Sequence, residues 1–307
     1  MDTNALIKCF KALSDPTRLR LFYVLQHYEL NVNEIVMVVG MIQSGVSRHL
    51  KILVDSDLLT SRKDGSFIYY SIAKNQIAQS LIFLIARKDS NDPMVEQDME
   101  TAREMIHIRQ NRTKRFFKSV APQWDRLKKE VFKEFDLNLV ISQKIEFSGF
   151  ISDLGCGTGE LVEQFASRSV GKIIGIDSSP EMLDQARKRL AGNPMIELRL
   201  GELEHLPMKN KEIDTAVMNM VLHHISQPRV SISEVFRVLK PGGVFVLSDF
   251  EKHDNEKIKQ IMGGSWMGFE QQEIKTWLTE SGFIFKTVDS YAVNHELTIN
   301  MFTAKKP

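Results

Sequence analysis

The sequence predicts an α/β protein of two domains, and two observations support this prediction. Residues 1–90 are patterned as short helices followed by one hairpin, whereas residues 147–307 alternate apolar strand-like runs with helical stretches. Such an alternation is typical of a parallel sheet with crossover helices. The length of 307 residues also fits two domains, since a domain commonly has ~100–200 residues.

Composition and charge exclude several classes of protein. Apolar residues make up 43% and charged residues 26% of the chain, which is typical of a globular protein and not of a disordered one. The formal net charge of +1 excludes a uniformly polybasic nucleic-acid binder but allows a local basic face. No apolar run approaches the ~18 residues of a membrane span, and the N-terminus lacks the features of a signal peptide. The only cysteines, Cys9 and Cys156, fit a reducing compartment, so we expect a cytoplasmic protein with no membrane contact.

The first domain carries the pattern of a helix-turn-helix. Ser14-Asp15-Pro16 ends one helix and caps the next, and a short third helix, 33–39, stops at Gly40. We expect Ser44 to cap a fourth helix, 45–55, whose outer face is polar. Such a helix after a tight turn is placed to enter the major groove. The side chains expected to contact DNA are Gln43, Ser44, Ser47, Arg48, His49 and Lys51.

A basic hairpin follows this helix. Residues 58–72 alternate like strands around Asp64-Gly65, a strong hairpin signal. A hairpin in this position is a wing, which can reach phosphates or the minor groove. The wing residues expected at DNA are Arg62, Lys63 and Ser66.

Together these motifs resemble the ArsR family of winged helix-turn-helix repressors. The resemblance rests on residues 10–20, 46–51 and 65–70 and covers about the first 90 residues. It implies binding to double-stranded operator DNA as a homodimer joined through the first and last helices of the domain. The last helix, 75–88, has a suitable apolar stripe made of Ile77, Leu81, Leu84 and Ile85. An ordinary hydrophobic core also produces such a stripe. A helical protein-interaction module is the alternative.

One segment departs from the metal sensors of that family. In those sensors two cysteines stand in a Glu-Leu-Cys-Val-Cys pattern, whereas here the chain has Glu29-Leu30-Asn31-Val32-Asn33. Asparagine offers no thiolate to a soft metal, and the helix 75–88 has no histidine for the family's zinc-type site. We therefore expect no metal site, and we expect Cys9 to be a buried apolar residue.

A long polar helix is expected between the two domains, over residues 92–120. Pro93 lies near its start and Pro122 just past its end, where proline is tolerated. Six basic residues and one acidic residue occur from Arg103 to Lys118. We expect residues 91–115 to form a solvated connector, with a contact to the DNA backbone as the alternative.

The second domain, 116–307, opens with a strand that runs into a glycine-rich turn. Gly155, Gly157 and Gly159 alternate before the helix 161–167. Glycines at this spacing let the backbone approach a ligand closely, and the helix start offers free N–H groups. A nicotinamide dinucleotide motif requires a third glycine where this chain has Glu160, so that cofactor is excluded.

Acidic residues follow the next two strands of this domain. The strand 172–176 ends at Asp177, placed to accept both hydroxyls of a ribose. Gly201-Glu202-Leu203 follows the third strand, where a carboxylate can meet an adenine amino group. Two further strands are expected at 214–220 and 244–249, the second introduced by a turn over 239–243.

From residue 116 onward this arrangement resembles the class I S-adenosylmethionine-dependent methyltransferases, which have a Rossmann-like fold. The resemblance implies S-adenosylmethionine or S-adenosylhomocysteine as the ligand, and a strand pair at 282–293 and 296–304 that completes the sheet. It assigns the glycine turn to the methionine end of the ligand, and it matches residues 116–125 to a segment that covers the pocket. The residues it assigns to ligand binding are Phe117, Trp124, Asp153, Gly155, Gly157, Gly159, Asp177, Ser178, Met182, Gly201, Glu202, Leu203 and Asn219.

Two functions follow from this combination of domains. The leading hypothesis is a DNA-binding repressor whose second domain senses S-adenosylhomocysteine or S-adenosylmethionine, since fused regulators that respond to S-adenosylhomocysteine are the nearest resemblance. The alternative is an active small-molecule methyltransferase with an autoregulatory DNA-binding domain. A ligand changes DNA binding only as far as its affinity differs between two states of the protein, and the helix 92–120 is the natural element to carry that effect.

Histidines and tryptophans bear on the choice between these functions. His223, His224 and His253 are candidates for a general base, although packing explains them more simply. His253 with Asp254 and Glu256 makes only a weak metal pattern. An arsenite methyltransferase would use several cysteines as arsenic ligands, and with only Cys156 in this domain that substrate is nearly excluded. A pocket sealed by Trp124 and Trp266 favours the sensor.

Overall fold

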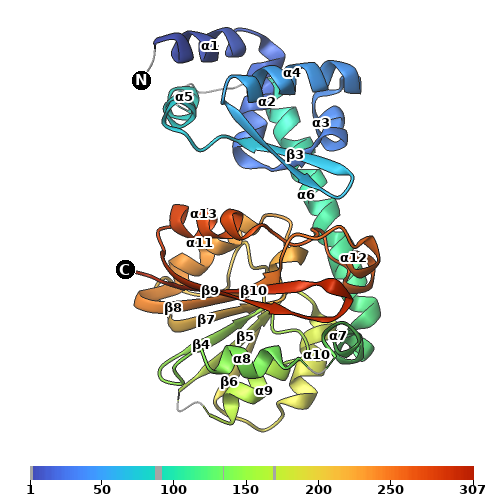
Figure 1. The fold of residues 1–307 in the computed structure, drawn as a ribbon, viewed down its shortest axis with the longest axis vertical. Helices are drawn as coiled ribbons and strands as arrows, with labels where there is room; N and C mark the ends of the chain where they lie inside the picture. The colour runs from blue at the N-terminus through green and yellow to red at the C-terminus, as the bar shows by residue number, and fades with distance from the viewer. Residues whose placement is uncertain (1–2, 87–91, 134, 169–170) are drawn as a thin grey trace. The chain divides into compact units, whose positions relative to one another are not determined.

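The chain forms two compact units, one ending at Arg109 and the other beginning at Gln110 (Figure 1). The computed structural model describes residues 3–86, 92–133, 135–168 and 171–307. Each unit has its own hydrophobic cluster. The division falls inside one continuous helix, α6 (Pro93–Val120), so the stretch expected as a connector is shared between the two units.

The first unit is a small helical domain with a three-stranded sheet in the order β1-β3-β2. Asp15 caps its second helix by accepting a hydrogen bond from the Arg18 N–H at 3.0 Å. The hairpin turns at Gly65, whose φ of 57° suits glycine. Its elements are α1 (Thr3–Leu13), α2 (Pro16–His27), β1 (Leu30–Asn31), α3 (Val32–Val39), α4 (Gln43–Asp55), β2 (Leu59–Asp64), β3 (Phe67–Ile72) and α5 (Gln76–Ala86).

The start of α4 differs from the expectation. The helix begins at Gln43, after Ile42, which makes no side-chain cap. The expected cap, Ser44, lies inside the first turn and is exposed. Ile42 has an extended backbone. The helix therefore begins at Gln43, two residues before the start at residue 45 that the sequence predicted.

One of the two asparagines at the family's cysteine positions, Asn31, caps a helix in this fold. Asn31 caps α3 by accepting the Glu34 N–H at 3.1 Å, and Glu34 accepts the Asn31 N–H at 2.8 Å. This reciprocal pair satisfies two N–H groups at the helix start.

Helix α6 has a buried face in the first unit, which its polar composition did not predict. Ala102, Met105 and Ile106 belong to the hydrophobic cluster of that unit. Arg20 of α2 donates two hydrogen bonds of 2.7 Å to Asp98, whose side chain is 2% exposed. The N-terminal part of α6 is therefore fixed to the first unit by packing and by a bidentate ion pair.

The second unit contains a seven-stranded sheet in the order β6-β5-β4-β7-β8-β10-β9. All neighbouring pairs are parallel except those made by β10. The strands are β4 (Ile151–Leu154), β5 (Ile173–Asp177), β6 (Ile196–Leu200), β7 (Ile213–Asn219), β8 (Leu239–Phe250), β9 (Ile284–Ala292) and β10 (Thr298–Lys305). The helices are α7 (Trp124–Phe132), α8 (Leu137–Ser142), α9 (Glu160–Ala166), α10 (Pro180–Arg189), α11 (Pro228–Val238), α12 (Glu256–Met262) and α13 (Gln271–Glu280), with short 3-10 turns at Ala121–Gln123, Leu222–His224 and Asn294–Glu296.

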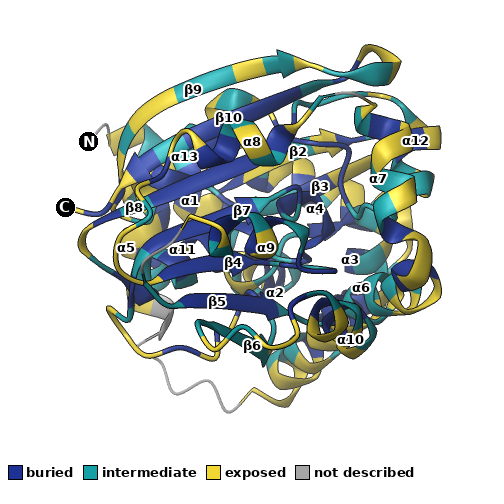
Figure 2. Ribbon diagram, turned by 90° about the horizontal axis from the view of Figure 1, so that it is seen from below, coloured by how far each residue is buried: buried dark blue, intermediate teal, exposed yellow. Residues whose placement is uncertain are grey.

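Strands in the middle of this sheet are buried nearly throughout, whereas the edge strand β9 is largely exposed (Figure 2). Helices therefore cover the central strands, as expected for a parallel sheet. The turn expected over 239–243 is instead part of β8, where the pairing with β7 shifts register.

Strand order places the expected ligand residues side by side. Parallel strands end at the same edge of a sheet, where ligands bind in open α/β folds. From β6 to β7, the expected residues at or just after the strand ends are Gly201, Asp177, Gly155 and Asn219.

We predict that Arg20→Ala destabilises the first unit by about 3–5 kcal/mol, because it leaves the buried Asp98 carboxylate without its cation. The matched control is Arg103→Ala, since Arg103 pairs with Glu100 on α6 with both side chains more than half exposed. That control is expected to stay within about 0.5 kcal/mol of the parent. Urea unfolding of both variants measures the difference, and equal losses would contradict the role of the buried pair.

Candidate functional site

A cavity of about 340 Å³ lies in the second unit, at the carboxyl edge of the parallel strands. Its wall comes from the ends of β4, β5, β6 and β7 and from α6, α7 and α8. Most of the ligand residues expected from the sequence line it: Phe117, Trp124, Asp153, Gly155, Gly157, Asp177, Ser178, Met182, Glu202, Leu203 and Asn219.

Two expected residues, Gly159 and Gly201, do not line the cavity. Gly159 has a φ of 80° at the start of α9, and a Cβ there would lie 2.9 Å from Leu190. A Cβ on Gly201 would lie 2.5 Å from Pro207. Both glycines therefore allow close packing of these neighbouring side chains.

Asp177 holds the glycine turn in place. Its Oδ2 accepts the Gly157 N–H and its Oδ1 accepts the Ser179 N–H, both at 2.8 Å. Burial raises the pKa of Asp177 to about 6, against the effect of these backbone donors. The carboxylate is thus fixed at the end of β5 beside the cavity.

Asp153 is a buried carboxyl group with an oxygen that has no partner. Its side chain is 2% exposed, and its Oδ1 has no hydrogen-bond donor within the described part of the chain. Burial raises the pKa of Asp153 to about 7, with Lys128 opposing and Asp177 adding to the shift. An unpartnered buried acceptor in a cavity wall suits a charged donor on a ligand, such as an ammonium group.

Aromatic rings form another part of the wall. The ring of Phe117 lies 5.2 Å from that of Trp124 and 4.8 Å from that of His224, both edge to face. Burial, followed by the neighbouring His223, lowers the pKa of His224 well below its ordinary value. His224 is therefore a neutral wall residue. His223 does not line the cavity, and its Nδ1 lies 2.8 Å from the buried Asp249 carboxylate.

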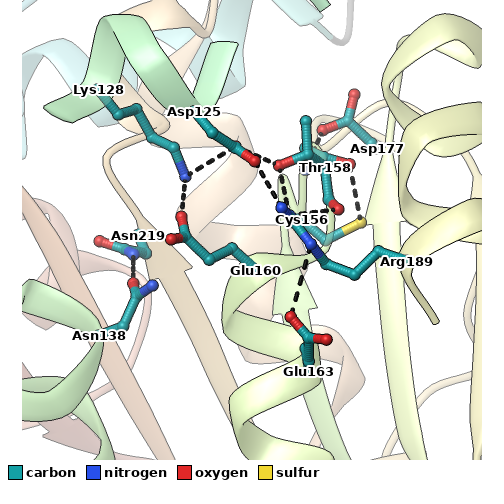
Figure 3. Close-up of polar contacts among 11 residues, drawn as sticks. Asp125, Lys128, Asn138, Cys156, Thr158, Glu160, Glu163, Asp177, Arg189 and Asn219 are labelled. Carbon is teal, nitrogen blue, oxygen red and sulfur yellow. Dashed lines mark hydrogen bonds and ion pairs between the residues drawn. The ribbon is translucent and has the colours of Figure 1, made fainter. Parts of the chain in front are cut away.

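A polar network ties α7 to the glycine turn (Figure 3). Asp125 accepts hydrogen bonds of 2.6 Å from the Thr158 hydroxyl and from Arg189. Lys128, on the same helix, bonds Glu160 at 2.5 Å. These contacts hold α7, which begins at Trp124, against the glycine turn at the carboxyl end of β4.

Sequence reasoning missed several wall residues. Glu204 is 4% exposed and accepts a hydrogen bond from Gln110 at 3.4 Å, and Lys114 forms an ion pair with Glu202. Glu204 stands two residues after an expected ligand residue, which is a usable signal, but the others belong to no motif. Wall residues that the sequence did not predict include Gln110, Thr113, Lys114, Phe132, Phe135, Asn138, Glu204 and Met262.

A cavity sealed by both Trp124 and Trp266, which would favour the sensor, is not what the structure has. Trp266 is 2% exposed and donates its indole N–H to the Ile225 carbonyl at 2.7 Å, and it is not among the wall residues. The weak metal pattern at His253 also finds no support, since the described ranges contain no cluster of three or more possible ligands.

The expected DNA-contacting residues fall into two groups. Two residues are held inside the first unit: Arg62 pairs with Glu29 at 3.1 Å and lies 5.8 Å over the Tyr69 ring, and the half-buried His49 lies 3.7 Å from Asp15. The remaining seven are exposed: Gln43, Ser44, Ser47, Arg48, Lys51, Lys63 and Ser66.

The two units thus define a winged helix-turn-helix and a Rossmann-like α/β domain with an added antiparallel strand pair. Residues 15–61 match the sequence model of bacterial regulatory proteins of the arsR family, and residues 152–247 match that of a methyltransferase domain. The chain therefore combines an ArsR-family helix-turn-helix with a methyltransferase domain.

Similar curated proteins match only parts of the chain. It is 41% identical over 99 residues to an uncharacterized 37.1 kDa protein in transposon TN4556 of Streptomyces fradiae, covering 32% of this chain and 29% of that protein. It is 36% identical over 107 residues to a demethylmenaquinone methyltransferase of Symbiobacterium thermophilum, covering 33% and 43%. The chain spans less than half the length of these relatives.

Solved structures share the fold of the second unit. The [4+2]-cyclase SpnF has a TM-score of 0.54 at 17% identity, covering 63% of this chain and 94% of that one. A phosphoethanolamine-type N-methyltransferase of Haemonchus contortus, solved with S-adenosylhomocysteine, has a TM-score of 0.50 at 17% identity, covering 55% and 52%. Within the described residues, no helix is long and apolar enough to cross a membrane.

We predict that the unliganded second unit loses stability as pH rises from about 4 to 7. Asp153 and Asp177 have pKa values of about 7 and 6 in the folded chain, so over this interval they hold protons that the unfolded chain has released. Asp153→Asn is expected to remove the larger part of this slope. Urea unfolding at several pH values measures it, and an unchanged slope in Asp153→Asn would contradict the assignment.

Proposed function

We propose that this protein is a transcriptional repressor that binds operator DNA through its first unit and senses S-adenosylhomocysteine or S-adenosylmethionine through its second. The observation that carries the proposal is the double role of helix α6. Ala102, Met105 and Ile106 of α6 belong to the core of the first unit, and Gln110, Thr113, Lys114 and Phe117 line the cavity of the second. A molecule that fills the cavity therefore touches the helix on which the DNA-binding unit is packed.

The cavity wall fits such a nucleoside. Asp177 at the end of β5 is available to ribose hydroxyls, and Glu202 after β6 to an adenine amino group. The unpartnered oxygen of Asp153 suits the ammonium group at the methionine end. The two nucleosides differ by one methyl group and one positive charge, so the titration below is run with each of them.

DNA binding is proposed for the exposed polar face of α4 and the wing. Arg48 and Lys51 are the cations of that helix, and Lys63 is the exposed cation of the wing. We propose a homodimer for the DNA-bound form. Exposed apolar side chains on α1 and α5 support it, with Phe10 and Phe83 more than half exposed. Ile85, expected in the same stripe, lies outside the residues whose side chains are described.

A second candidate function is methyl transfer to a small molecule. The cavity wall also includes Phe132, Phe135 and Met262 together with the Asn138 amide, and we propose that an acceptor lies against these residues. Asn138 Oδ1 accepts a hydrogen bond of 3.0 Å from Asn219 Nδ2, which holds the two side-chain amides together. Turnover of S-adenosylmethionine with any acceptor would favour this function.

We predict that one nucleoside shifts the operator Kd at least tenfold at a fixed salt concentration, because a response of this size needs only ~1.4 kcal/mol of differential affinity. The measurement is a fluorescence titration of the protein's own upstream DNA, run with each nucleoside separately. Asp177→Ala is expected to lose the response and keep the basal operator affinity.

Two controls make this test decisive. Calorimetry checks that Asp177→Ala still unfolds cooperatively, since Asp177 also holds the glycine turn. Glu202→Ala provides a second variant, because Glu202 pairs only with Lys114 among the ion pairs of the second unit that the structure describes. Operator binding that tracks the nucleoside in both variants would contradict the proposal.

A further inference from the structure

Arg109, at the end of the first unit's share of α6, is joined to α3 by a two-pronged ion pair. Its Nε donates to Glu34 Oε1 at 2.7 Å, and its Nη2 pairs with Glu34 Oε2. Its Nη1 donates to the main-chain carbonyl of Glu29 at 3.2 Å. The Arg109 and Glu34 side chains are 13% and 15% exposed. A planar guanidinium held on both sides in this way fixes the direction as well as the distance between two helices.

Glu34 is also part of the start of α3. The same carboxylate accepts the Asn31 N–H at 2.8 Å and so completes the cap of that helix. Helix α3 packs against α4, which carries the exposed residues proposed to meet the major groove. A change in the position of Arg109 therefore acts on the first turn of the helix that supports the recognition helix.

Arg109 reaches the wing as well. Its guanidinium lies 5.1 Å over the ring of Tyr69 on β3, and the guanidinium of Arg62 on β2 lies 5.8 Å from the same ring. Arg62 pairs with Glu29, whose carbonyl Arg109 contacts. Tyr69 is 7% exposed, so this stack is buried and connects α6 with both strands of the hairpin.

The cavity wall begins at the very next residue. Gln110 lines the cavity and donates a hydrogen bond to Glu204. Lys114, about one helical turn further on, forms an ion pair with Glu202. On the same helix, the contacts of Arg109 with the first unit are therefore followed directly by the side chains of Gln110 and Lys114, which line the cavity. No loop or glycine separates the two sets, since α6 is helical throughout from Pro93 to Val120.

We propose that Arg109 is the positioning residue through which occupancy of the cavity sets operator affinity. A nucleoside that engages Glu202 or Glu204 competes for the partners of Lys114 and Gln110, and the resulting movement of α6 is passed by Arg109 to α3 and to the wing. This inference rests on the proposed function. It adds to that function the residue that carries the coupling.

The test compares three variants of the full chain. Arg109→Lys keeps the charge but loses the fork and the stacking over Tyr69, and Glu34→Gln keeps the size and a cap acceptor but loses the charge. Arg103→Lys is the matched control, since it lies on the same helix in an exposed pair with Glu100. For each variant the operator Kd is measured with and without S-adenosylmethionine or S-adenosylhomocysteine, and the nucleoside Kd is measured separately by calorimetry.

We expect the wild type and Arg103→Lys to show the full, at least tenfold, change in operator Kd. Arg109→Lys and Glu34→Gln are expected to bind the nucleoside within about twofold of wild type yet to change operator Kd less than about twofold. A full response in both variants would overturn the inference and leave the proposed function standing. Weakened nucleoside binding in both would also overturn it, because Arg109 would then act on the cavity itself. Absence of a response in the wild type would instead remove the proposed function.

Discussion

The structure depends on one helix that belongs to two cores. Helix α6 has 28 residues; its first part is held to the DNA-binding unit by buried apolar side chains and by the pairs Arg20–Asp98 and Arg109–Glu34. Its last part supplies the wall of the cavity. Residues of both units are therefore carried by one continuous helix.

Charge placement gives the cavity its chemical character. Asp153 and Asp177 are carboxyl groups whose burial raises their pKa values, which makes the empty site costly at neutral pH. A ligand that brings an ammonium group and hydroxyl donors relieves that cost. The pKa of His224, lowered by burial, keeps that ring neutral beside the aromatic rings, so it adds no positive charge to the wall. The proposed sensing and the alternative of methyl transfer both begin with binding of the nucleoside, so this arrangement is compatible with either proposal.

Much of this site was predictable because its residues follow the ends of strands. The glycine turn, Asp177 and Glu202 are set by local sequence, since a strand, a turn and a helix start can each be recognised from neighbouring residues. Gln110, Lys114 and Phe135 were not predictable, because they reach the cavity only through tertiary packing. Gly159 was assigned to ligand binding from its motif, and in the structure a Cβ at this position would lie 2.9 Å from Leu190, so packing also accounts for a glycine there. In the first unit, the pairing of Arg62 with Glu29 depends on contacts between distant segments, which no local pattern reveals.

Amide hydrogen exchange along α6 tests whether a bound nucleoside alters both parts of this helix. The full chain is compared with and without saturating S-adenosylmethionine or S-adenosylhomocysteine, in the absence of DNA. We expect one nucleoside to change the exchange of residues 98–109 and of the strands β2 and β3, in addition to that of residues 110–124. A change confined to residues 110–124 and the glycine turn would contradict the claim, since the ligand would then be bound without any effect on the DNA-binding unit.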